Sequence, residues 1–140
     1  MDLFLSKKPD EELLSRIVSD VRPVVFISDW ISSPLSEEHH VIVLSQNKSE
    51  FPWGLSFGKE ADDQEAWLLS AAWNLSILAG CRTLYTGSPL ERAKPWHCIV
   101  FDQGRAFLAD DSETRLMGDG EQEVNILRRL DQSYFPESFW

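Results

Sequence analysis

Apolar residues recur along this chain with two spacings, one typical of strands and one typical of helices. Continuous β-branched and aromatic runs at 24–27 and 41–44 predict strands that are buried on both faces. Residues 53–57 alternate large apolar side chains with small ones, which predicts a strand with a single core face. Because the connections between these three segments are a loop and a turn, the order favours an antiparallel meander.

The second half of the chain predicts a further short strand and a hairpin. Residues 83–85 form the short strand, and the apolar runs at 97–101 and 105–108 are the two arms of the hairpin. The connection at 102–104 places Gly104 where a three-residue loop needs a positive φ angle.

Three segments have the spacing of helices. Pro9 suits a first helical position, acids follow it, and an apolar stripe then continues until the Arg22-Pro23 pair ends the helix. A second helix runs from Asp62 or Asp63 to about Ala79 with apolar residues almost all around it, so we expect it to be buried inside the fold. The third helix is expected at 121–130, where acids open the segment and arginines close it.

These segments predict an α+β fold, a mostly antiparallel sheet of five or six strands packed against two or three helices. The chain has 140 residues, which is a usual size for one domain, so we expect residues 1–140 to form a single domain. The aromatic segment 134–140 is expected to fold back onto the body.

The net charge is −10, from 23 acidic and 13 basic residues, and the excess is concentrated in two stretches. The first acidic stretch, 50–65, has five acids and one base, and the second, 102–123, has seven acids and two bases. Such a charge repels nucleic acids and anionic membranes, which argues against both as partners. It favours either a solubilising surface or a face that attracts a basic protein.

The chain has no signal-peptide pattern and no apolar run near the ~20 residues needed to cross a bilayer, so we expect a cytoplasmic protein. Cys81 and Cys98 are too few for a disulfide framework and are expected to be reduced core thiols. No metal or other cofactor is expected, because the histidines and cysteines have no ligand spacing.

Catalytic patterns are weak in this sequence. Gly54, Ser56 and Gly58 match the Gly-x-Ser-x-Gly letters, but the predicted helix begins too late for a nucleophile elbow. Cys98 and its neighbour His97 should point to opposite faces of a strand, so they cannot act as nucleophile and base. Phosphate-binding glycine loops are absent. We therefore expect a binding protein, with a small hydrolase that uses Ser56 or His97 as an alternative.

In size, acidity and aromatic content the whole chain resembles the immunity proteins of bacterial toxin–immunity systems, such as contact-dependent inhibition. The resemblance implies that the protein neutralises a cytosolic toxin by covering its active site or a basic surface. A phage-encoded inhibitor that mimics nucleic acid fits the same acidity. Trp53 or Trp96 would be an aromatic anchor, and the two acidic stretches are expected to converge on one side. The partner-binding residues would then be Glu60, Asp62, Asp63, Glu65, Asp110, Asp111, Glu113, Asp119, Glu121 and Glu123.

Overall fold

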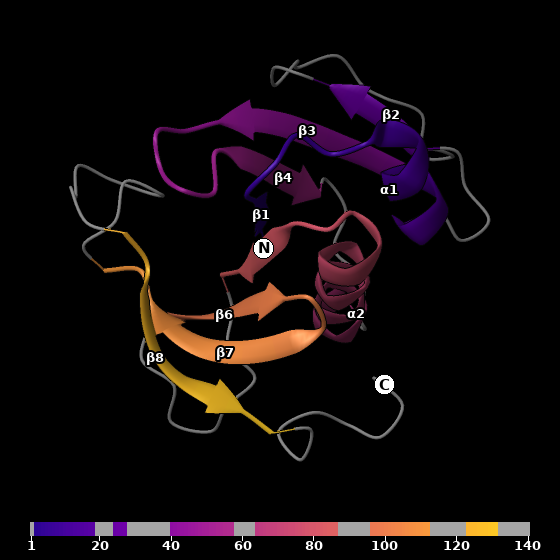
Figure 1. Ribbon diagram of the computed structural model, residues 1–140. Coiled ribbons are helices and arrows are strands. Elements are labelled where there is room, and N and C mark those ends of the chain that lie inside the picture. The colour runs from indigo at the N-terminus through magenta and orange to yellow at the C-terminus, as the bar shows by residue number, and fades with distance from the viewer. Residues whose placement is uncertain are drawn as a thin grey trace.

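The computed structural model describes residues 2–18, 24–27, 40–57, 64–86, 96–112 and 123–131. These residues form one sheet of eight strands and two helices, α1 (Glu11–Val18) and α2 (Gln64–Leu78) (Figure 1). The strands are β1 (Asp2–Leu5), β2 (Val24–Ile27), β3 (His40–Gln46), β4 (Trp53–Phe57), β5 (Arg82–Tyr85), β6 (His97–Asp102), β7 (Arg105–Asp110) and β8 (Asn125–Leu130).

The strand order across the sheet is β2-β3-β4-β1-β5-β6-β7-β8. All neighbours are antiparallel except β2 and β3, so the predicted mostly antiparallel α+β fold is confirmed. The predicted count of five or six strands is wrong. The predicted meander is also wrong for β2 and β3, which run parallel. Their connection at 28–39 has about the length that a parallel crossover requires.

The N-terminal segment is a strand that the sequence analysis did not predict. β1 lies in the middle of the sheet and pairs with β4 on one side and β5 on the other. Leu3, Phe4 and Leu5 are all buried, because a strand between two others and between two packed faces exposes neither side. This strand joins the two halves of the sheet.

The two predicted helices that lie in the described ranges are confirmed, with shifted starts. α1 begins after Asp10, whose carboxylate accepts hydrogen bonds from the amides of Glu12 and Leu13 at 3.0 and 3.4 Å, so Asp10 is the N-cap and Pro9 precedes the helix. α2 ends at Leu78, and Gly80, two residues later, has a φ of +61° as expected just after a helix C-terminus. Asp62 and Asp63, the predicted caps of α2, lie outside the described residues.

The third predicted helix is wrong, because residues 125–130 form the strand β8. Acids at the start of this segment and arginines at its end would interact favourably with a helix dipole. The backbone nevertheless forms hydrogen bonds with β7 and so is a strand. The apolar side chains of a six-residue segment fit either spacing, and pairing with a formed hairpin decides between them.

Both faces of the sheet are packed, and the two helices of the described ranges lie on one of them. On the helix-covered face, α2 places Leu68, Ala72 and Leu75 against strand residues such as Tyr85 and Phe101. The expectation of a buried second helix is confirmed for these side chains. The opposite face, which we call the second face, has its own cluster of buried residues. Its members are Phe4, Phe51, Leu84, Cys98, Val100 and Ala109.

The β6–β7 hairpin is confirmed, with a shorter loop than predicted. Asp102 pairs with Arg105, so the loop is the two residues Gln103 and Gly104, with φ angles of +50° and +80°. Two positive φ angles are typical of the type I′ turn that suits a two-residue hairpin. The loop packs on α2, where the Trp73 indole donates to the Gly104 carbonyl at 3.0 Å and the Gly104 amide donates to the Ser76 hydroxyl at 3.1 Å.

Candidate functional site

Three of the ten predicted partner-binding residues have side chains that the structure describes. They are Asp110 and Asp111 at the end of β7 and the exposed Glu123 just before β8. Glu65 lies in the first turn of α2, and only its backbone is described. The other six, Glu60, Asp62, Asp63, Glu113, Asp119 and Glu121, lie outside the described residues. The described ranges contain 11 acids and 8 bases, so only −3 of the net −10 falls within them.

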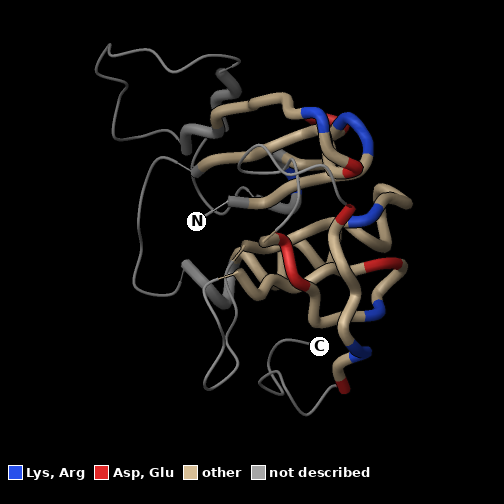
Figure 2. The backbone as a smooth tube through the Cα atoms, turned by 90° about the vertical axis from the view of Figure 1, so that its left-hand side faces the viewer, with Lys and Arg blue, Asp and Glu red and all other residues tan. Residues whose placement is uncertain are grey.

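The described charges are mixed rather than wholly acidic. Figure 2 shows most of the lysines and arginines along one side of the molecule, with acids between them. The two acidic stretches meet at one place, which is built around Glu50.

Glu50 sits in a tightly hydrogen-bonded loop between β3 and β4. The Asn47 side chain accepts from the Ser49 amide at 2.8 Å and donates to the Phe51 carbonyl at 2.9 Å, while the Asn47 amide donates to the Pro52 carbonyl at 2.9 Å. Such Asx-type bonds fix a turn without help from the rest of the chain. The loop therefore presents the Glu50 and Phe51 side chains in one conformation.

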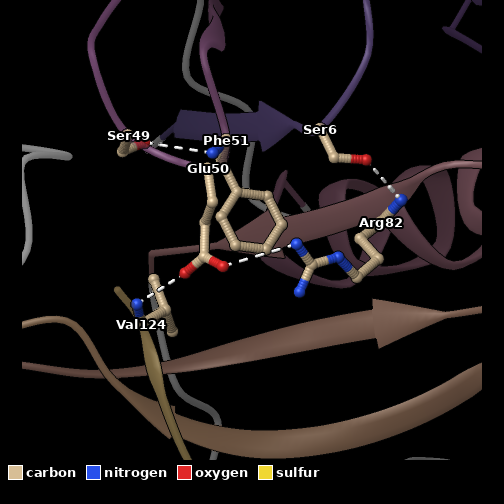
Figure 3. A network of polar contacts seen from close by, with 6 residues as sticks. All are labelled: Ser6, Ser49, Glu50, Phe51, Arg82 and Val124. Carbon is tan, nitrogen blue, oxygen red and sulfur yellow. Dashed lines mark hydrogen bonds and ion pairs between the residues drawn. The ribbon is translucent and has the colours of Figure 1, made fainter. Parts of the chain in front are cut away.

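The Glu50 carboxylate ties this loop to two other segments (Figure 3). One oxygen accepts from the Val124 amide at 2.5 Å, and the other lies 3.4 Å from the Arg82 guanidinium. Arg82 also stacks over the Phe51 ring, with its Cζ 5.1 Å from the ring centroid. Because only 14% of the Glu50 side chain is exposed, the carboxylate acts in the fold and is not available to a partner.

These contacts bring the chain segments of four acids into one region, which we call the acidic corner: Glu50, Asp110, Asp111 and Glu123. Val124, which holds Glu50, follows Glu123 directly, and the next residue, Asn125, pairs with Asp110. The acidic corner thus joins the first residue of the first acidic stretch to both ends of the 110–123 segment. Two basic residues near this corner are Arg82, which is paired with Glu50, and the exposed Lys48 on the same loop.

Trp96 is the aromatic residue of the acidic corner. Its carbonyl accepts from the Asp111 amide at 3.0 Å, and 40% of its surface is exposed. Trp53, the other predicted anchor, is partly buried on the helix-covered face, with the Lys8 ammonium 5.6 Å from the centroid of its ring. A cationic partner would meet a lysine at Trp53 but carboxylates at Trp96. Trp96 is therefore the better candidate for an anchor.

Burial and like charge both act on Asp111 in the acidic corner. Burial raises the pKa of Asp111, and the neighbouring Asp110 raises it further, while its backbone hydrogen bond and nearby His97 oppose the shift. Burial, together with Asp111 and Asp110, also raises the pKa of the Cys98 thiol. Cys98 therefore stays protonated at neutral pH and is a buried thiol, not a nucleophile.

The raised pKa of Asp111 predicts a pH-dependent cost to stability. The fold favours the protonated form, so the contribution of Asp111 is most favourable below its ordinary pKa and is lost as the pH rises through the folded-state value. We expect Asp111→Asn to melt at a higher temperature than the wild type at pH 7, with a gain that disappears toward pH 3. Thermal melts across this range test the prediction.

The matched control is Asp131→Asn, which removes an exposed carboxylate that lies just after β8. It should change the melting temperature little at any pH, as surface substitutions usually do. A gain for Asp111→Asn that persists at pH 3 would contradict the electrostatic explanation.

The structure separates the residues of the alternative hydrolase site. Ser56 lies within β4, on the side opposite Leu55, whereas His97 lies on the same side of its strand as Ile99, which is the helix-covered face. Three strand spacings, about 14 Å along the sheet, also separate β4 from β6. Ser56 and His97 therefore do not form a nucleophile–base pair.

Within the described ranges, no three His, Cys, Asp or Glu side chains are grouped so that they could hold a metal ion. Cys81 and Cys98 are both free and buried. Neither α1 nor α2, the helices of the described ranges, has the length and apolar content needed to span a membrane.

Comparisons with protein-family models, with curated proteins and with solved structures find no match to this chain.

Glu50 and Arg82 were not among the predicted site residues. Glu50 was counted in the first acidic stretch, but its role depends on contacts with residues 32 and 74 positions away along the chain. No local pattern in the sequence could have shown those contacts. The one local signal was the turn chemistry of 47–50, which fixes the loop that carries Glu50.

Proposed function

We propose that this protein is an immunity-type binding protein that neutralises a cytosolic toxin through the acidic corner. Asp110, Asp111 and Glu123 would meet a basic surface of the toxin, and Trp96 would pack against an apolar or guanidinium group beside it. The observation that carries the proposal is the pair of adjacent carboxylates, held beside a half-exposed indole on a hairpin that is fixed to α2.

The energetic cost of this arrangement supports a binding role. Two like charges in sequence, one of them partly desolvated, lower the stability of the free protein. A cation from a partner would remove that penalty on binding, so the penalty in the free protein favours association. Binding sites commonly retain such unfavourable groups at the expense of stability.

Charge reversal in the acidic corner should weaken partner binding. For Asp110→Lys/Asp111→Lys we expect an affinity loss of about ten-fold or more, because attraction becomes repulsion and electrostatic steering is lost. Wild type and variant are immobilised, exposed to a host lysate, and the differentially retained protein is identified and purified. Its dissociation constant is then measured by calorimetry at low and moderate salt.

The matched control is Glu11→Lys/Glu12→Lys, which makes the same change in net charge on the exposed start of α1. Equal losses for both double variants would mean that only net charge matters, and unchanged affinity for the acidic-corner variant would exclude this site. A retained toxin supports the immunity function. A retained DNA-binding protein would instead support the nucleic-acid mimic.

A further inference from the structure

β8 lies at one edge of the sheet, and this edge has features that favour pairing with a strand of another chain. It pairs with β7 on one side, and within the described ranges no strand pairs with its other side. An edge strand presents unpaired backbone amides and carbonyls along that side, and these groups can continue a sheet into another chain. Proteins usually protect such edges with charges or bulges, and β8 has both, so association requires a partner strand that neutralises the charges of Arg128 and Arg129.

The side chains of β8 are apolar in its middle. Ile126 and Leu127 are 45% and 44% exposed, and they are neighbours in sequence. A bulge places Ile126 opposite Ala109 and Arg128 opposite Leu108, so Leu127 has no partner in the register with β7. Two adjacent exposed aliphatic residues at an unpaired edge are the usual centre of a strand-to-strand contact.

The charges along β8 are self-complementary. Glu123 lies just before the strand, and Arg128 and Arg129 lie near its end, all exposed. A two-fold rotation about an axis near Ile126 makes two β8 strands antiparallel and places the acidic start of each beside the arginines of the other. Because the contact is isologous, each favourable charge pairing occurs twice.

We propose that two copies of this chain associate reversibly through β8, edge to edge and antiparallel. The exposed apolar residues lie at the centre of the interface, and Glu123 of each copy faces the arginine pair of the other. Each chain carries a net −10, but at physiological ionic strength charges more than about 8 Å apart are largely screened, so the charges next to the axis decide the outcome. This association shares Glu123 with the proposed toxin-binding site but does not use Asp110 or Asp111.

Reciprocal charge reversal tests the pairing by sedimentation velocity over a range of protein concentrations. We expect the wild type to form a dimer reversibly, and Glu123→Arg and Arg128→Glu/Arg129→Glu each to raise the dimer dissociation constant about ten-fold or more, because both symmetric contacts become repulsive. An equimolar mixture of the two variants should regain the dimer as a heterodimer, since each contact then joins opposite charges again.

Glu11→Arg is the matched control for Glu123→Arg, and it should leave the association unchanged. Circular dichroism melts confirm that each variant is folded, and recovery in the mixture could not come from two misfolded chains. A wild type that stays monomeric at every concentration, variants that dimerise as the wild type does, or a mixture that stays monomeric would each overturn the proposal.

Discussion

Replacing Phe51 by alanine is expected to lower the free energy of unfolding by about 3–5 kcal/mol, the usual cost of deleting a buried aromatic side chain. The Phe51 ring is fully buried in the cluster on the second face, beneath the Arg82 guanidinium. Within the described ranges no helix lies over this face, and the Phe51 ring packs into its cluster of buried residues. Urea unfolding at pH 7 measures the loss.

Lys48→Ala is the control for Phe51→Ala, because Lys48 lies on the same loop and is exposed. It should change the free energy of unfolding by less than about 0.5 kcal/mol. A loss below about 1 kcal/mol for Phe51→Ala would mean that the loop does not close the second face. Since Phe51 is adjacent to Glu50, a large loss also implies that the acidic corner depends on the packing of this loop.

The sequence predicted most strands of this fold because their patterns are local. The runs at 24–27, 41–44 and 53–57 and the hairpin arms needed only alternation or apolar continuity. The N-terminal strand was not predicted, because its apolar run, residues 3–5, is only three residues long. A short apolar run between polar residues also fits a central strand, and that signal was present in the sequence.

The wrong helix at 121–130 has a different cause. Ile126, Leu127 and Leu130 have helical spacing, and the flanking charges suit a helix dipole, so local chemistry favours a helix. The hydrogen bonds to β7 outweigh that preference, and they come from residues about 20 positions earlier in the chain. A six-residue segment with a modest intrinsic preference is readily changed by such tertiary pairing.

The candidate site was predicted only in part, for the same physical reason. Asp110, Asp111 and Glu123 were selected from local charge density, and the structure places them near one another. What joins them to the first acidic stretch is Glu50, through single hydrogen bonds to distant segments. Charge density along a sequence indicates where acids are abundant, whereas their convergence depends on loop geometry and strand order.

The β6–β7 hairpin links stability to the site, because one end of it docks on α2 and the other carries Trp96, Asp110 and Asp111. The docked end depends on Gly104, whose amide and carbonyl both bond to α2 side chains. The Ser76 hydroxyl that receives the amide donates in turn to the Trp73 carbonyl at 2.7 Å. A change at Gly104 therefore alters the anchor of the strands that present the acidic corner.

Gly104→Ala is expected to lower the free energy of unfolding by about 2 kcal/mol. At a φ of +80° a side chain is strained by about 1 kcal/mol or more, and the added Cβ would lie 3.2 Å from the Ile77 Cδ1, so that Ile77 must shift.

Gly80→Ala is the matched control. Its φ is +61° with no atom within 4 Å of the added Cβ, so it should show the backbone strain alone, about 1 kcal/mol. Urea unfolding of both variants measures how much more stability Gly104→Ala loses than Gly80→Ala. Adding Ile77→Ala to Gly104→Ala should reduce this extra loss, because it removes the side chain that the new Cβ contacts. Equal losses at the two glycines would show that the hairpin tolerates the new contact with α2 at no cost.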